Sequence, residues 1–162
     1  MKSIFLLLSL ALSTMSFAQQ YDLEDQENSI IITENNKSIL KIDVKEPMQV
    51  AVKNCSGFKA ANVEGGVSAY TETLRRYMFN YLNSEFYVLN GDFTFTLILN
   101  EAGKISKIEG FPKVEHSEVF FDDMKYILRR IKNTWTPASC NGKPMTSEVK
   151  IKMKFNSIAT DI

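Results

Sequence analysis

Apolar and polar residues alternate along three segments of the chain in the period typical of β-strands. From residue 149 to 155 every second residue is apolar and those between are charged, which predicts a strand at 146–155 with one buried face. Similar alternation predicts strands at 92–99 and 104–111, joined by a turn in which Gly103 can adopt a positive φ angle. Together these segments predict an antiparallel sheet with one face in water.

Two other segments have the period of a helix. Apolar residues recur every three or four positions over 68–84 and over 118–132, which predicts two amphipathic helices. The second helix ends in Arg129, Arg130 and Lys132, which complement the negative end of its dipole. We therefore predict an α+β fold of two layers, in which two helices cover one face of a small antiparallel sheet in a β-α-β-β-α-β-like order.

The N-terminal part of the chain has patterns of its own. An isoleucine-rich run at 29–33 and apolar alternation at 39–44 flank a turn-forming Asn-Asn pair, which predicts a β-hairpin. The segment 19–28 is polar and acidic and predicts a frayed tail. Because neither region belongs to the helix and strand pattern that follows, we treat both as an N-terminal extension.

The first 18 residues have the layout of a secretory signal peptide. Lys2 provides the charge, an apolar run follows, and Ser16-Phe17-Ala18 forms a small-x-small cleavage site. The run is shorter than the about 20 apolar residues of a membrane helix, so we expect cleavage after Ala18 and a periplasmic or secreted protein. The predicted organisation is a signal peptide at 1–18, a tail and hairpin extension at 19–62, and a main domain at 63–162.

The charge balance, the two cysteines and the single histidine limit the functions that the protein can have. The chain has 19 basic and 19 acidic residues, which argues against nucleic acid as a partner because phosphate binding requires excess Lys and Arg. In an oxidising compartment Cys55 and Cys140 predict a disulfide, with two buried or reactive thiols as the alternative. The single histidine, His116, lacks a spaced nucleophile or carboxylate and is interpreted as a surface or capping residue.

The turn between the second helix and the last strand has a recognisable layout. Trp135, the only tryptophan, precedes Pro137 and Ala138, and a Gly-x-Pro turn follows. With the glycine pair before the first helix and the hairpin glycine, this layout resembles the TonB C-terminal domain in its short, exported, Bacteroidetes-type form. The resemblance covers roughly residues 63–155. Its matching positions are Gly65, Gly66, Gly103, Trp135, Pro137, Ala138, Gly142, Pro144 and Phe155.

The resemblance implies a binding function in the cell envelope. In that family the domain pairs with a short extended segment of an outer-membrane transporter. We therefore expect a non-catalytic module that binds a strand of an envelope protein, such as an outer-membrane transporter, along an edge of its sheet. Edge pairing between two copies, giving a homodimer, is left open. We expect the last strand to form this edge, at Val149, Lys150, Ile151, Lys152, Met153 and Lys154.

Two other functions are weighed against this one. A TonB-type energy transducer would keep an uncleaved N-terminus as its membrane anchor, but the chain has no Pro-rich, Lys/Glu-rich spacer to cross the periplasm. A thiol oxidoreductase could use Cys55 and Cys140, yet the chain lacks Cys-x-x-Cys and a Gly-rich phosphate loop. One histidine and two thiols are too few for a four-ligand zinc site. We therefore predict that the protein is not an enzyme and uses no cofactor or metal.

Overall fold

A computed structural model describes residues 29–34, 37–49, 51–52, 54–82 and 87–158. The predicted signal peptide, its cleavage site and the acidic tail lie outside these residues. The elements in chain order are β1 (Ser29–Glu34), β2 (Lys37–Val44), β3 (Met48–Gln49), β4 (Phe58–Lys59), β5 (Asn62–Val63), α1 (Gly66–Tyr81), β6 (Asn90–Leu99), β7 (Ile105–Phe111), α2 (Glu118–Arg130), β8 (Trp135–Thr136), β9 (Ala138–Cys140), β10 (Lys143–Met145) and β11 (Ser147–Ser157).

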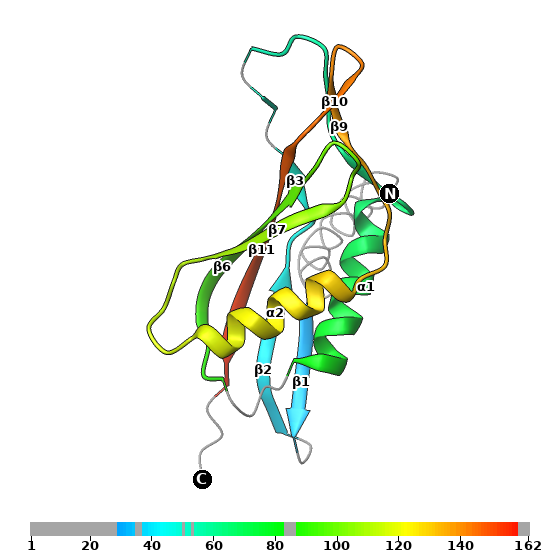
Figure 1. The fold of residues 1–162 in the computed structure, drawn as a ribbon. Helices are drawn as coiled ribbons and strands as arrows, with labels where there is room; N and C mark the ends of the chain where they lie inside the picture. The colour runs from blue at the N-terminus through cyan, green and yellow to red at the C-terminus, as the bar shows by residue number, and fades with distance from the viewer. Residues whose placement is uncertain (1–28, 35–36, 50, 53, 83–86, 159–162) are drawn as a thin grey trace, which may run out of the picture.

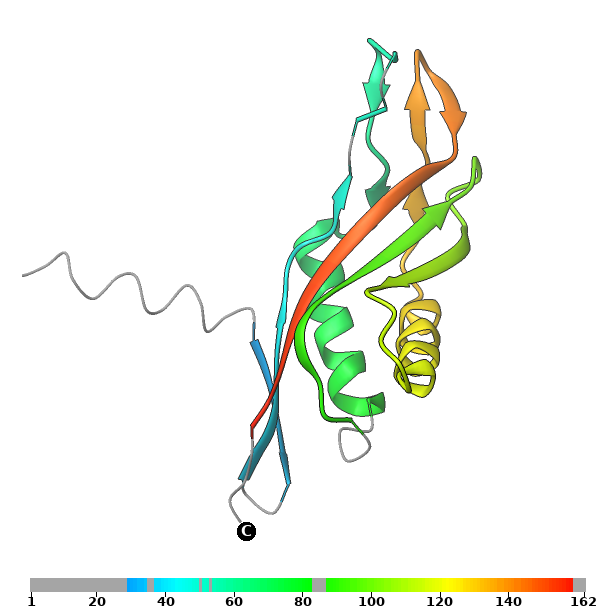
Figure 2. The same cartoon turned by 90° about the vertical axis from the view of Figure 1, so that its left-hand side faces the viewer.

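The main sheet has six strands in the order β1-β2-β11-β6-β7, with β3 also beside β11 (Figure 1). All of its pairings are antiparallel, and the longest joins β11 to β6 from Ser147 opposite Leu99 to Asn156 opposite Asn90. Both helices lie on the same side of this sheet (Figure 2). The predicted α+β class is confirmed.

The N-terminal hairpin is confirmed, but it is part of the main sheet rather than an appendage. Strand β2 pairs with β11 from Val44 opposite Met153 to Leu40 opposite Ser157. Leu40, Ile42 and Val44 are almost completely buried. The hairpin joins the sheet because this apolar face needs a core to cover it.

The core lies between the helices and the facing side of the sheet. The alternation predicted for the last strand is confirmed, since Val149, Ile151, Met153 and Phe155 are at most 1 % exposed. Phe155 meets Phe120 of α2 edge to face, with ring centroids 5.2 Å apart. Aromatic pairs of this geometry stabilise the contact between helix and sheet beyond the burial of their area.

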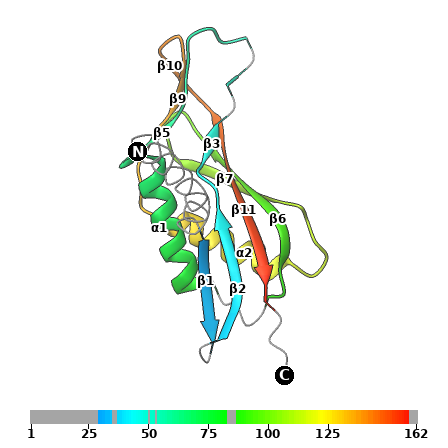
Figure 3. The same ribbon diagram turned by 180° about the vertical axis from the view of Figure 1, so that it is seen from behind.

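Two small sheets extend the main sheet at the end where β9 and β10 lie (Figures 1 and 3). Strands β10, β9 and β4 form one of them, and β5 with β8 forms the other. Cys55 and Cys140 are bonded here, with Cα atoms 5.9 Å apart, so the predicted disulfide is confirmed. It links the segment before α1 to the turn region after α2.

Candidate functional site

Strand β11 is a central strand, so the predicted partner-binding edge is wrong. One side of β11 pairs with β6 along ten residues, and the other side pairs with β3 at Val149 and Lys150 and with β2 from Met153 onward. Between these two pairings the N–H of Lys45 donates to the carbonyl of Lys152 at 2.9 Å. The hairpin treated as an extension occupies the side that was expected to be free. The six positions affected are Val149, Lys150, Ile151, Lys152, Met153 and Lys154.

The main sheet ends at β1 on one side and at β7 on the other. Among the strands that the structure describes, β7 pairs with β6 alone, over the seven residues Ile105–Phe111. An edge strand presents main-chain N–H and C=O groups that can pair with another chain. Strand β7 therefore offers the kind of surface that the sequence had placed on β11.

A hollow of about 860 Å³ runs between β7 and the beginning of α2. Two apolar side chains are exposed on its wall, Phe111 at 71 % and Val114 at 47 %. The buried Ser117 hydroxyl donates to the carbonyl of Val114, which holds the connecting loop against the helix. This hollow places apolar surface directly beside an unpaired strand edge.

The same strand carries an ion pair on its solvent side. Lys107 Nζ lies 2.5 Å from a carboxylate oxygen of Glu109, and both side chains are more than half exposed. The hydrogen bond from Lys107, followed by its charge, holds the pKa of Glu109 below its ordinary value. The carboxylate form of Glu109 is thus favoured by its neighbour.

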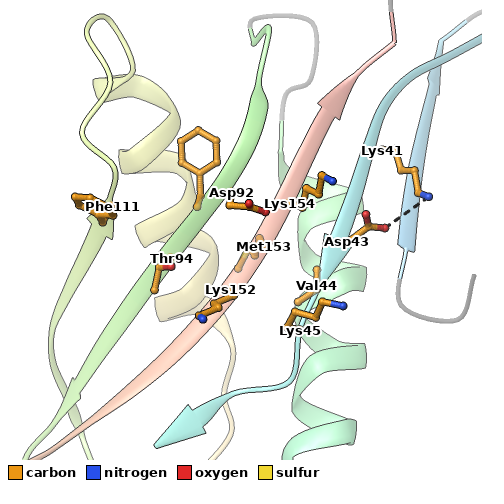
Figure 4. Close-up of a pocket in the computed structure, with 11 residues that line it drawn as sticks. Lys41, Asp43, Val44, Lys45, Asp92, Thr94, Phe111, Lys152, Met153 and Lys154 are labelled. Atoms are coloured by element: carbon orange, nitrogen blue, oxygen red, sulfur yellow. Dashed lines mark ion pairs between the residues drawn. The ribbon is translucent and has the colours of Figure 1, made fainter. Parts of the chain in front are cut away.

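The face of the sheet opposite the helices carries a second hollow, of about 620 Å³ (Figure 4). We call this side the open face. The hollow has polar and apolar walls in about equal parts and crosses β2, β11, β6 and β7. Its wall includes Lys41, Asp43, Lys45, Asp92, Thr94, Phe111, Lys152 and Lys154. Phe111 lines both hollows, because it projects from β7 at their boundary.

The glycines and the tryptophan of the sequence motif have structural roles. A Cβ atom on Gly103, which has φ +72°, would lie 1.9 Å from the carbonyl oxygen of Trp135. Trp135 is 4 % exposed and meets Tyr70 of α1 edge to face, with ring centroids 5.3 Å apart. The hairpin turn and the Trp-x-Pro segment therefore pack against each other.

The remaining motif residues also shape the backbone. Gly65, Gly66 and Gly142 all have positive φ angles near 80°. Ala138 is completely buried, whereas Pro144 lies exposed in β10. None of these residues lines the hollow beside β7 or the one on the open face.

Candidate groups for chemistry are separated in the structure. The ring of His116 is 90 % exposed and lies 3.5 Å from Glu115. Within the described ranges, no group of three or more His, Cys, Asp or Glu residues is placed to hold a metal ion. Tyr87 donates a hydrogen bond to Asp123, and its pKa is raised by burial first and by that carboxylate second.

No helix in the part of the chain that the structure covers is sufficiently long and apolar to cross a bilayer.

The fold and these surfaces define an α+β protein with one helix-covered sheet face, one open face and a strand, β7, whose outer edge no other described strand covers. No family model, curated protein or solved structure matches the chain. The resemblance to the TonB C-terminal domain therefore stays a prediction from the motif residues.

Sequence reasoning missed the surface residues of β7. A signal for them exists, since Phe111 has the same alternation phase as Lys107 and Glu109. Packing of the hydrophobic core does not explain an aromatic residue at a solvent-facing position of a strand. Phe111 was interpreted only as part of the strand predicted at 104–111.

Proposed function

We propose that the protein is an exported, non-catalytic module that binds an extended segment of another envelope protein as an added strand on β7. The observation that carries this proposal is the pairing of β7 on one side only, beside a hollow with exposed apolar walls. In strand addition, main-chain hydrogen bonds provide affinity and side-chain pockets provide specificity. A free edge next to a hollow meets both requirements.

The side chains around β7 indicate what the partner segment contains. An added strand would run beside Lys107, Glu109 and Phe111 on the open face. We expect an apolar or aromatic residue next to Phe111, since covering an exposed ring favours binding. Residues of opposite charge beside Lys107 and Glu109 would fix the register of the partner.

The sequence motif supports the choice of partner class. The family that the chain resembles binds extended segments of outer-membrane transporters, and the same class of ligand suits the free edge of β7. The edge itself differs from the one expected from the sequence, because β11 is already paired on both sides.

Amide exchange measured by NMR tests the proposal. The probes are synthetic peptides of about ten residues that cover the periplasm-facing segments of outer-membrane transporters. In an antiparallel sheet, a strand's main-chain groups point alternately to its two sides, so a bound peptide should slow exchange at every second amide of β7. Amides of β11 should not change. Slowing at β1 would move the site to the other edge, and no slowing at either edge would overturn the proposal.

A matched pair of substitutions tests the role of the exposed ring. Phe111→Ala should weaken peptide binding about 5- to 30-fold, corresponding to the loss of roughly 1–2 kcal/mol from partial burial of one aromatic side chain. Phe79→Ala is the control, because Phe79 is 56 % exposed on α1 and lines neither hollow. Calorimetric titration of both variants should show the loss for Phe111→Ala alone.

A further inference from the structure

We propose that the open face holds a binding site for an acidic oligosaccharide, centred on Lys45 and Lys152. The proposal does not require strand addition at β7, since Lys45, Lys152 and Thr94 lie on other strands and only Phe111 lines both hollows. The hollow drawn in Figure 4 is its location.

Strand register places four side chains in one row across the sheet. Lys45 lies opposite Lys152, to which it is joined by the main-chain hydrogen bond of 2.9 Å. Lys152 lies opposite Thr94, and Thr94 lies opposite Phe111. The row therefore contains two ammonium groups, one hydroxyl and one aromatic ring, all on the wall of the same hollow.

The two lysines of this row differ from Lys154 in the residues that lie opposite them, none of which is acidic among the described strands. In the adjacent row Lys154 lies between Asp43 and Asp92, so its neighbours on both strands are acidic. Lys152 instead has a lysine on one side and a threonine on the other. Within the residues that the structure describes, neither Lys45 nor Lys152 takes part in an ion pair.

Like charges directly opposite each other destabilise a sheet. The pair Lys45 and Lys152 therefore gains nothing from its cross-strand contact, and the hollow that it lines contains four lysines, Lys41, Lys45, Lys152 and Lys154, against two aspartates, Asp43 and Asp92. The two side chains extend in opposite directions in Figure 4, Lys152 toward Thr94 and Lys45 away from it, so an anionic ligand lying over the row would reduce the repulsion and accept charge-assisted hydrogen bonds from these ammonium groups. This arrangement favours a ligand with a carboxylate or sulfate at the lysine end of the row.

The other end of the row suits a sugar ring. Phe111 is 71 % exposed and can cover the apolar face of a ring, while the hydroxyl of Thr94 can exchange hydrogen bonds with sugar hydroxyls. Neighbouring strands are about 4.8 Å apart, so the row spans roughly 14 Å, which accommodates a short oligosaccharide. A hollow of about 620 Å³ leaves room for it. A flat lipid surface would not follow such a depression, which favours the oligosaccharide over a membrane.

The test compares two lysines of the same strand and face. Lys152→Gln removes a lysine of the row, whereas Lys150→Gln removes one that lies 4.0 Å from Glu148 and does not line the hollow. We expect trigalacturonate to shift the amide signals of Lys45, Thr94, Phe111 and Lys152 in a saturable way. Lys152→Gln should weaken this binding at least tenfold and Lys150→Gln less than twofold. The stability of both variants should stay at or above that of the wild type.

Other probes define the outcomes that would overturn the proposal. Maltotriose, a neutral sugar of similar size, should cause no shift, and added salt should weaken trigalacturonate binding. Equal losses for the two lysine variants would indicate general attraction of a polyanion rather than a site. Equal binding of a triglutamate peptide would reject the sugar assignment, and sedimentation with phosphatidylglycerol vesicles, without trigalacturonate binding, would assign the lysines to a membrane.

Discussion

Replacing Gly103 by alanine tests the packing of the hairpin turn against the Trp135 segment. Gly103 has φ +72°, and a Cβ atom added there would lie 1.9 Å from the Trp135 carbonyl oxygen. An ordinary contact begins near 3.4 Å, so turn and strand would have to separate by 1.5 Å (3.4 − 1.9). Because the opposing atom belongs to the backbone, rotation of a side chain cannot relieve the clash.

Gly142→Ala is the matched control for this substitution. Gly142 has φ +80°, but a Cβ atom there would meet nothing within 4 Å. Alanine in the left-handed region costs roughly 1–2 kcal/mol, and the stiffer unfolded chain offsets about 0.4–1 kcal/mol of it. We expect Gly142→Ala to lower the free energy of unfolding by about 1 kcal/mol.

Gly103→Ala should carry the same backbone cost plus that of overpacking, about 1–3 kcal/mol. Its free energy of unfolding should therefore fall by about 2–4 kcal/mol. Urea denaturation followed by circular dichroism, with the disulfide intact in each variant, measures both changes. Losses equal within about 0.5 kcal/mol would refute the contact between turn and strand as the reason for glycine at this position.

Three further predictions concern stability. Replacing Cys55 and Cys140 together by serine should lower the free energy of unfolding by at most about 4–5 kcal/mol, and adding reductant should abolish the difference from wild type in urea denaturation. Lys150→Pro should cost about 3 kcal/mol or prevent folding, because β11 is paired on both sides there, while Lys150→Ala should change the urea midpoint little. The Tyr70 hydroxyl is buried without a hydrogen-bond partner among the described residues, so Tyr70→Phe should leave stability equal or raise it by up to about 1 kcal/mol. Burial raises the pKa of Tyr70 above its ordinary 10.0, so above about pH 10 the unfolded chain loses the Tyr70 proton while the folded chain keeps it. This residue should therefore lower the free energy of unfolding of the wild type, but not of Tyr70→Phe, as the pH rises above about 10.

Local patterns predicted the two helices and the long strands but not the short strands β4, β5, β8, β9 and β10. The order of the strands required information from distant parts of the chain. The alternation that ends at Phe155 and the helical period that includes Phe120 each depend on neighbours in sequence, and both were interpreted correctly. Which strand lies beside β11 depends on residues more than 100 positions earlier, such as Leu40 opposite Ser157. The apolar alternation at Leu40, Ile42 and Val44 was the available signal, because such a face requires a core.

The candidate site was harder to predict than the fold for the same reason. Phe111, Lys152 and Lys45 come to lie in one row only through the registers of the strands between them. Their spacing in the sequence does not indicate that they lie in the same row. The disulfide could be predicted because the chain contains only two cysteines and a predicted signal peptide.

The two proposed ligands would share one side chain, and this makes their binding coupled. Phe111 lines both the hollow beside β7 and the hollow on the open face, so a peptide that covers the ring removes it from the oligosaccharide site. Thermodynamic linkage requires each ligand to weaken the other by the same factor. Phe111→Ala should therefore weaken both ligands and abolish their competition, whereas Lys152→Gln should weaken the oligosaccharide alone. Binding of both ligands without mutual effect would show that the ring serves at most one of them.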